Sequence, residues 1–255
     1  VGDEAGTALT TGDENTFIGY TAGDATTTAT GNTALGFSAL TTNVLGSRSV
    51  AIGRAALQVQ NPASAVNMYN VAVGHGAGES VTTGVQNTFI GGLSGDANTT
   101  AANNTAVGYA SLGANTTGTG NVALGANALD ANTTASQNTA VGIHSLGANT
   151  TGHSNAALGA YALNVNTTGN YNIGIGRNTM AANTTGSNNI AVGSYALDAN
   201  TTASNNTALG YDALTANTTG TGNSALGKGS LGANTTASYN TGLGENALLS
   251  NTTGA

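Results

Sequence analysis

A repeat of 17 residues runs along most of this chain, and it restricts the possible folds more than any other feature of the sequence. An asparagine opens each copy; it stands at Asn104 and returns at every seventeenth residue as far as Asn240. A period of this length indicates a repeat architecture, in which each copy buries its core by stacking on its neighbours. We therefore expect a single repeat domain over residues 1–255.

The same period continues towards the N-terminus, with asparagine in the leading position of every copy except one. Ser49 replaces it there, and the distance from Ser49 to Asn70 is 21 residues instead of 17. The extra four residues fall in a segment that contains Pro62, the only proline of the chain. Because insertions in stacked repeats form loops on one face, we expect a four-residue insertion near residues 58–68 to protrude as a loop.

Each copy begins with residues that favour a short strand. The first three positions after the leading asparagine carry mostly Thr, Val or Ile, then Ala, then Val, Ile or Leu, and β-branched residues are enriched in strands. The fourth position is always glycine, which indicates a positive φ angle or a close approach of two backbones. We call these structural residues the corner glycines: Gly19, Gly36, Gly53, Gly74, Gly91, Gly108, Gly125, Gly142, Gly159, Gly176, Gly193, Gly210, Gly227 and Gly244.

The second half of most copies carries a leucine eight residues after the leading asparagine, preceded by a small residue and followed by Asn-Thr-Thr. The leucine predicts a second, weaker extended segment, and Asn-Thr-Thr predicts a turn. The glycines and the Asn-Thr-Thr run disfavour helix. Together these features predict an all-β fold, a parallel β-solenoid or β-roll of about fifteen coils of 17 residues each.

The first strand of each copy has apolar residues on both faces. Side chains alternate along a strand, so the alanine in the middle, such as Ala106, faces away from its neighbours Thr105 and Val107. One face can line the coil interior, but the other needs a cover, and the sequence predicts no helix to provide it. We expect the alanine column to face water in an isolated chain, and other copies of the chain to cover it.

Two copies exchange residues between two columns of the repeat. Phe17 and Phe89 replace the alanine of the strand, and in the same copies Gly23 and Gly95 replace the leucine six residues later. We infer that the alanine and leucine columns share one volume inside the structure. Gly6 and Gly78 also lack the leucine; the alanine position of the first copy lies before Val1, and Gly78 follows Ala72, so the rule is imperfect.

The composition excludes several classes of partner. Charged residues make up 6% of the chain, the formal net charge is −7, and the four basic residues form no cluster, so we expect no nucleic acid partner. Cysteine is absent, which excludes disulfides and thiolate metal sites. Apolar runs are only a few residues long, whereas a helix needs about 20 apolar residues to cross a membrane. We therefore expect no membrane insertion in this segment.

The segment Ser49–Ala56, with the sequence Ser-Val-Ala-Ile-Gly-Arg-Ala-Ala, resembles the head repeat of the YadA-type trimeric autotransporter adhesins. The copies from Asn104 onwards, of the form Asn-Thr-Ala-Val-Gly-Tyr, also resemble repeat shafts of bacterial surface proteins and of phage-like tail fibres. The resemblance covers nearly the whole chain and implies a left-handed parallel β-roll, three chains around one axis, and binding to host or matrix surfaces. The repeat differs from the adhesin heads in its longer period, and the Asn-Thr-Thr turn resembles an added corner.

No group of residues predicts catalysis or metal binding. The three histidines, His75, His144 and His153, stand apart, and none has a second histidine at metal-ligand spacing. The acidic residues are isolated; four aspartates share one column of the repeat, but not in successive copies. We therefore expect no enzyme activity, no catalytic residue, and no metal or cofactor.

The Asn-Thr-Thr turn is also an acceptor sequence for N-glycosylation. A structural turn is the alternative, because asparagine tolerates a left-handed backbone and its side chain bonds nearby peptide groups. One early copy has Thr27–Thr28 at this place without the asparagine, which favours a structural threonine ladder. The candidate glycosylation sites are Asn98, Asn103, Asn115, Asn132, Asn149, Asn166, Asn183, Asn200, Asn205, Asn217, Asn234 and Asn251.

These observations predict a structural and adhesive fibre segment, such as a surface adhesin head or a tail-fibre-like shaft, that is extracellular, at the cell surface or on a virion. Its partners would be copies of itself, as a homotrimer, and a host surface or matrix glycan or protein. One alternative is a subunit of a secreted or cell-surface filament that assembles end to end, because the repeat shows no polar cap at either end. Another is an ice-binding solenoid, because a regular threonine column can form a flat array.

Overall fold

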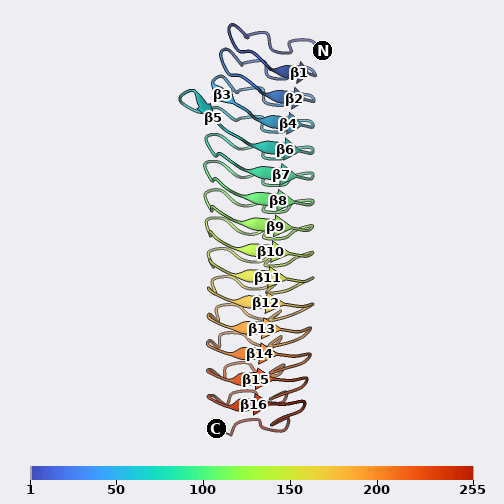
Figure 1. Cartoon of the computed structure of the whole chain (residues 1–255), viewed down its shortest axis with the longest axis vertical. Helices are drawn as coiled ribbons and strands as arrows, with labels where there is room; N and C mark the ends of the chain where they lie inside the picture. The colour runs from blue at the N-terminus through green and yellow to red at the C-terminus, as the bar shows by residue number, and fades with distance from the viewer. Residues whose placement is uncertain (1, 255) are drawn as a thin grey trace. The chain divides into compact units, whose positions relative to one another are not determined.

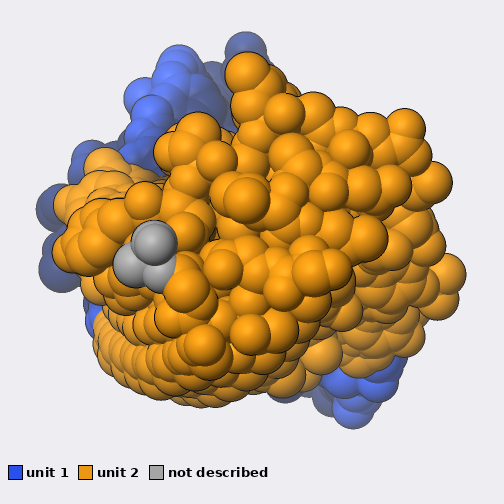
Figure 2. Space-filling view, turned by 90° about the horizontal axis from the view of Figure 1, so that it is seen from below, with its two compact units in different colours: residues 1–127 blue, residues 128–255 orange. Residues whose placement is uncertain are grey.

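The computed structural model describes residues 2–254 and is an all-β parallel solenoid in which successive copies of the repeat form successive coils. Contacts group the chain into two compact units, residues 1–127 and 128–255, which Figure 2 colours separately. Each unit is built from the same repeat, and within each unit the strands follow one another in chain order (Figure 1). A single domain over residues 1–255 stays a prediction.

Within each unit, every repeat strand is three residues long and pairs in parallel with the strand of the neighbouring coil, at the same position of the repeat. Unit 1 contains β1 (Thr16–Ile18), β2 (Thr33–Leu35), β4 (Val50–Ile52), β6 (Val71–Val73), β7 (Thr88–Ile90), β8 (Thr105–Val107) and β9 (Val122–Leu124). Unit 2 contains β10 (Thr139–Val141), β11 (Ala156–Leu158), β12 (Ile173–Ile175), β13 (Ile190–Val192), β14 (Thr207–Leu209), β15 (Ser224–Leu226) and β16 (Thr241–Leu243). The predicted first strand of the repeat is therefore confirmed.

The segment after each corner glycine is a pair of turns, and our prediction of a second extended segment there is wrong. In the coil of β13, Ala196 N donates to Gly193 O (3.2 Å) and Asn200 N donates to Leu197 O (3.1 Å). Ala196 and Leu197 are both fully buried, although consecutive residues of a strand face opposite sides. The chain turns both side chains inward by placing Leu197 in the left-handed region, at φ 53°.

The alanine column lines the interior of each coil, and our expectation that it faces water in a single chain is wrong. Ala191 of β13 is fully buried, whereas its neighbours Ile190 and Val192 are 39% and 36% exposed. The interior is narrow because the leucines of the turns reach across it. A Cβ atom added to Gly174, which takes the alanine position in β12, would lie 3.4 Å from Leu163 of the preceding coil.

The alanine and leucine columns share one volume, as the exchanges in the sequence predicted. Phe89 is fully buried, and a Cβ atom on Gly95 would lie 2.8 Å from Cζ of its ring. A Cβ atom on Gly78, in the preceding coil, would lie 2.8 Å from the opposite edge of the ring, at Cδ2. One ring therefore occupies the leucine space of two successive coils, which explains why the copy with Ala72 has Gly78 in place of leucine although it carries no phenylalanine. The surroundings of Phe17 follow the same arrangement.

The corner glycines combine a left-handed backbone with close contact between coils. Gly193 has a φ angle of +134°, and a Cβ atom on it would lie 2.6 Å from the carbonyl carbon of Gly210 in the next coil. Only glycine adopts this conformation without strain, and only a hydrogen in place of Cβ leaves room for the neighbouring backbone. The column is therefore restricted to glycine both by its φ angle and by the close contact with the next coil.

Two columns of buried asparagines tie the coils together. Asn189, a leading asparagine, donates its backbone N–H to Asn172 Oδ1 (3.0 Å) and its side-chain amide to Ala203 O (2.9 Å). Asn200, from the Asn-Thr-Thr turn, donates its side-chain amide to Asn183 Oδ1 (2.7 Å) and to the same Ala203 O (3.1 Å). Within residues 2–254, no buried side-chain nitrogen or oxygen lacks a hydrogen-bond partner. The hydrogen bonds of these ladders therefore replace those that the amides would make with water.

The coil with the inserted residues keeps these ladders by a compensating pair. Ser49 replaces a leading asparagine, and Gln60 stands where other coils have the asparagine of the Asn-Thr-Thr turn. The longer Gln60 side chain accepts a hydrogen bond from Asn70 Nδ2 (2.9 Å) and donates one to Ser49 Oγ (3.1 Å). After Gln60 the chain leaves the coil, and β5 (Val66–Asn67) pairs with β3 (Gly46–Ser47), at the protruding loop in Figure 1.

Candidate interaction surface

The outer sheet face is formed by the first and third residues after each leading asparagine, which point away from the coil interior. No residue at these positions carries a charge in either unit. The third position holds Val, Ile or Leu in every strand, and several of these side chains are more than a third exposed. They are Ile18, Leu35, Ile90 and Leu124 in unit 1, and Leu158, Ile175, Val192, Leu226 and Leu243 in unit 2.

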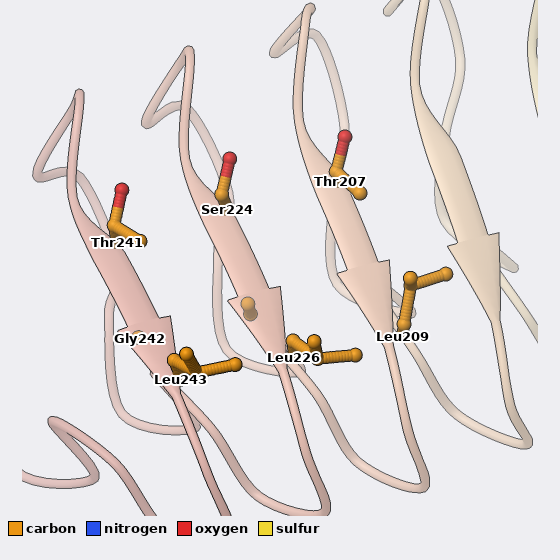
Figure 3. A pocket seen from close by; sticks show the side chains of 8 residues that line it. Thr207, Leu209, Ser224, Leu226, Thr241, Gly242 and Leu243 are labelled. Carbon is orange, nitrogen blue, oxygen red and sulfur yellow. The ribbon is translucent and has the colours of Figure 1, made fainter.

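A hollow of about 270 Å³ lies on the outer sheet face of unit 2, over β14, β15 and β16 (Figure 3). The hydroxyl residues Thr207, Ser224 and Thr241 line one side, and leucines line the other. The preceding strands β12 and β13 have the bulkier Ile173 and Ile190 at the first position. Hydroxyl residues rather than isoleucine therefore border this hollow.

A corner of unit 1, beside the outer sheet face, carries side chains that contact each other from coil to coil. The rings of Tyr20 and Phe37 stack with centroids 5.4 Å apart, and the guanidinium of Arg54 lies 5.7 Å from the Phe37 centroid. Arg54 Nη1 in turn lies 3.0 Å from His75 Nε2. These exposed groups follow the corner glycines, so the repeat brings them into one column.

The structure does not bring the histidines or the aspartates together. His144 stacks on Tyr161, and His153 meets Tyr171 edge to face. Burial raises the pKa of the Asp130 carboxyl, and the charge of His144 opposes this shift. Within residues 2–254, no group of three or more His, Asp or Glu side chains could hold a metal ion.

The candidate glycosylation sites divide into buried and exposed asparagines. Nine of the ten asparagines in Asn-Thr-Thr are fully buried in the ladder that Asn200 exemplifies, and Asn251 of the last coil is half-buried. A glycan on a buried member would require its amide to leave the interior and break these hydrogen bonds. Asn103 and Asn205 are exposed instead, and both have a left-handed backbone next to the outer sheet face. Asn103 and Asn205 are therefore the candidate sites most open to a modifying enzyme in the folded coil.

Sequence reasoning found the two-faced strand but assigned its faces the wrong way round. The Phe89–Gly95 exchange was the signal that could have corrected it, because a phenylalanine shares a volume with leucine only if its column faces inward. The hollow and the corner contacts were missed, since they depend on how residues of neighbouring coils align.

Comparison with known proteins identifies no relative. No protein family, no curated protein and no solved structure matches this chain. Between residues 2 and 254 there is no helix long and apolar enough to span a membrane. The resemblance to trimeric adhesins therefore stays a prediction.

Proposed function

We propose that this chain is a structural and adhesive segment of an extracellular fibre, formed by three copies that pack their outer sheet faces together. The main support is the outer sheet face, which is uncharged and lined by exposed Val, Ile and Leu in both units. Large exposed apolar patches on soluble proteins mark interaction sites. Burying these side chains would remove apolar surface from water, at about 25 cal/mol per Å².

The partner that fits this face best is another copy of the chain. Each coil presents its apolar side chains at the strand-to-strand spacing of about 4.8 Å. A partner with the same repeat makes the same contact at every coil. An alignment that is favourable at one coil is therefore favourable along the whole unit. A surface with another spacing would lose this match after a few coils. Closed point symmetry is also the common form of homo-oligomers.

The adhesive part of the proposal rests on the exposed corners. Tyr20, Phe37, Arg54 and His75 stay outside the sheet face and form a mixed aromatic and basic column. Such side chains suit contact with a glycan or protein of a host surface or matrix. The proposed activity needs no catalysis, cofactor, nucleic acid or membrane insertion.

Light scattering tests the oligomer. We expect a particle of three times the chain mass of 24.5 kDa, and we expect a monomer after Ile175→Asp with Val192→Asp, which places charges on the outer sheet face. Thr185→Asp is the matched control, because this exposed turn residue lies away from that face. A particle of twice the chain mass would exclude the trimer, and a stable monomer of the unchanged chain at micromolar concentration would exclude self-association.

Adhesion requires a separate measurement on the trimer. Beads coated with the protein should be retained on surfaces carrying matrix glycans or proteins, and Arg54→Ala with Phe37→Ala should reduce the retention. Equal retention of coated and uncoated beads would leave a structural role without adhesion.

A further inference from the structure

Two tyrosines of unit 2 meet at the corner between consecutive coils. Tyr195 lies in the turn after β13, and Tyr211 follows the corner glycine after β14. Their ring centroids are 6.1 Å apart at an interplanar angle of 82°. The residues next to them join the two coils, since Asp212 N donates a hydrogen bond to Ser194 O (3.2 Å). The coil-to-coil ladder therefore joins the two turns that carry these rings.

Both phenols are accessible from solvent. Tyr211 is 50% exposed and Tyr195 is partly exposed. A soluble oxidising enzyme or its small radical products can therefore reach them in the folded protein.

No other tyrosine pair has this relationship in the part of the chain that the structure describes. The ring partner of Tyr20 is Phe37, and those of Tyr161 and Tyr171 are His144 and His153. None of these partner rings carries a phenol. The Tyr195–Tyr211 contact is therefore the one place where a radical formed on one tyrosine finds a second tyrosine ring beside it.

We propose that Tyr195 and Tyr211 form an oxidative cross-linking site, which a haem peroxidase with hydrogen peroxide converts to a dityrosine bond between adjacent coils. Each phenol loses one electron and its hydroxyl proton to give a phenoxyl radical. The two radicals combine through a carbon–carbon bond between ring carbons ortho to the oxygens. Each ring then loses its ortho proton and regains it at the oxygen, and one hydrogen peroxide is reduced to two water molecules. The product joins two coils covalently in a chain that has no cysteine.

The positions of the basic residues make the cross-link easy to locate. Trypsin cleaves after Arg177 and Lys228, and the peptide 178–228 between them contains Tyr195 and Tyr211 and no other tyrosine. After brief treatment of the folded protein with peroxidase and hydrogen peroxide, we expect this peptide to lose two hydrogens and to show dityrosine fluorescence. The cross-linked chain should keep the mass of a single chain under denaturing conditions.

Matched variants separate this site from general oxidation. Tyr195→Phe and Tyr211→Phe keep the ring but remove the phenol, and each should reduce the cross-linked peptide by at least tenfold. Tyr161→Phe should leave it unchanged, because Tyr161 stacks on a histidine in another coil. Circular dichroism verifies that the variants fold.

Two results would overturn the proposal. One is an unchanged peptide 178–228 while chains become joined to one another through other tyrosines, such as Tyr239, which is 83% exposed. The other is an equal yield of the cross-linked peptide from folded and urea-unfolded chains, which would mean that the coil geometry contributes nothing.

Discussion

The interior around Phe89 in unit 1 and the regular interior of unit 2 use different residues to fill the same kind of coil. In unit 2, Ala191 of the strand packs opposite leucines of the turns, and all are fully buried. Around Phe89, one aromatic ring fills the space, and Gly78 and Gly95 replace the leucines on either side. The repeat therefore conserves the volume inside the coil rather than the residue in any one column, as expected for a closely packed interior.

The polar columns show the same behaviour. In unit 2, two asparagines of equal length, Asn189 and Asn200, share one carbonyl acceptor. In unit 1, the shorter Ser49 is matched by the longer Gln60, whose amide provides the bonds that Ser49 cannot make. Every copy in both units keeps its corner glycine. A change in another column could not make room for a Cβ atom so close to the backbone of the next coil.

The largest effect should come from a corner glycine. Gly193→Ala places a methyl group 2.6 Å from the backbone of Gly210, and we expect the free energy of unfolding to fall by more than about 4 kcal/mol. Gly120→Ala is the control: its φ angle is also positive, but a Cβ atom there meets nothing within 4 Å. A similar loss in both variants, measured by denaturant unfolding, would show that the close contact with Gly210 contributes little.

The aromatic interior should depend on its ring as much as the regular interior depends on its leucines. Phe89→Ala should lower the free energy of unfolding by about 3–5 kcal/mol, because it leaves a cavity bounded by glycines. Leu197→Ala in unit 2 should cost about 2–5 kcal/mol. A cost below 1 kcal/mol for Phe89→Ala would mean that the coil collapses around the missing ring, contrary to a conserved volume.

The exchange between columns should appear as coupling. Gly95→Leu alone should cost about 1–3 kcal/mol through overpacking against the ring. Combined with Phe89→Ala it rebuilds the alanine–leucine pair of the regular coils, so the double variant should be more stable than the sum of the single costs predicts, by more than about 1 kcal/mol. Additive costs in a double-mutant cycle would contradict direct contact between the columns.

The smallest effect should come from the compensating polar pair. Gln60→Asn shortens the side chain and removes its hydrogen bond to Asn70, at a cost of about 1 kcal/mol. Adding Ser49→Asn should recover that loss, because it recreates the two-asparagine arrangement of unit 2. Thermal unfolding of both variants measures the difference, and a double variant less stable than Gln60→Asn would contradict the compensation.

The strand and the contact between the alanine and leucine columns could be predicted from residue pattern alone. Strand residues followed by a glycine identify a local structure, and a correlated exchange such as Phe89 with Gly95 reports contact in space. The turns could not be predicted in this way. Leucine favours extended or helical backbone, and only the stacking of coils holds Leu197 at a positive φ angle.

The period, the parallel β-solenoid and the space inside each coil follow from residue spacing and side-chain volume, which the copies repeat, so they could be predicted from the sequence. The folded structure was needed to show where Ile173 gives way to the hollow around Ser224 and which tyrosines meet. The physical reason is that these features depend on the alignment of neighbouring coils. Two consecutive inward side chains, Ala196 and Leu197, close the coil around the alanine column and leave the larger aliphatic residues outside.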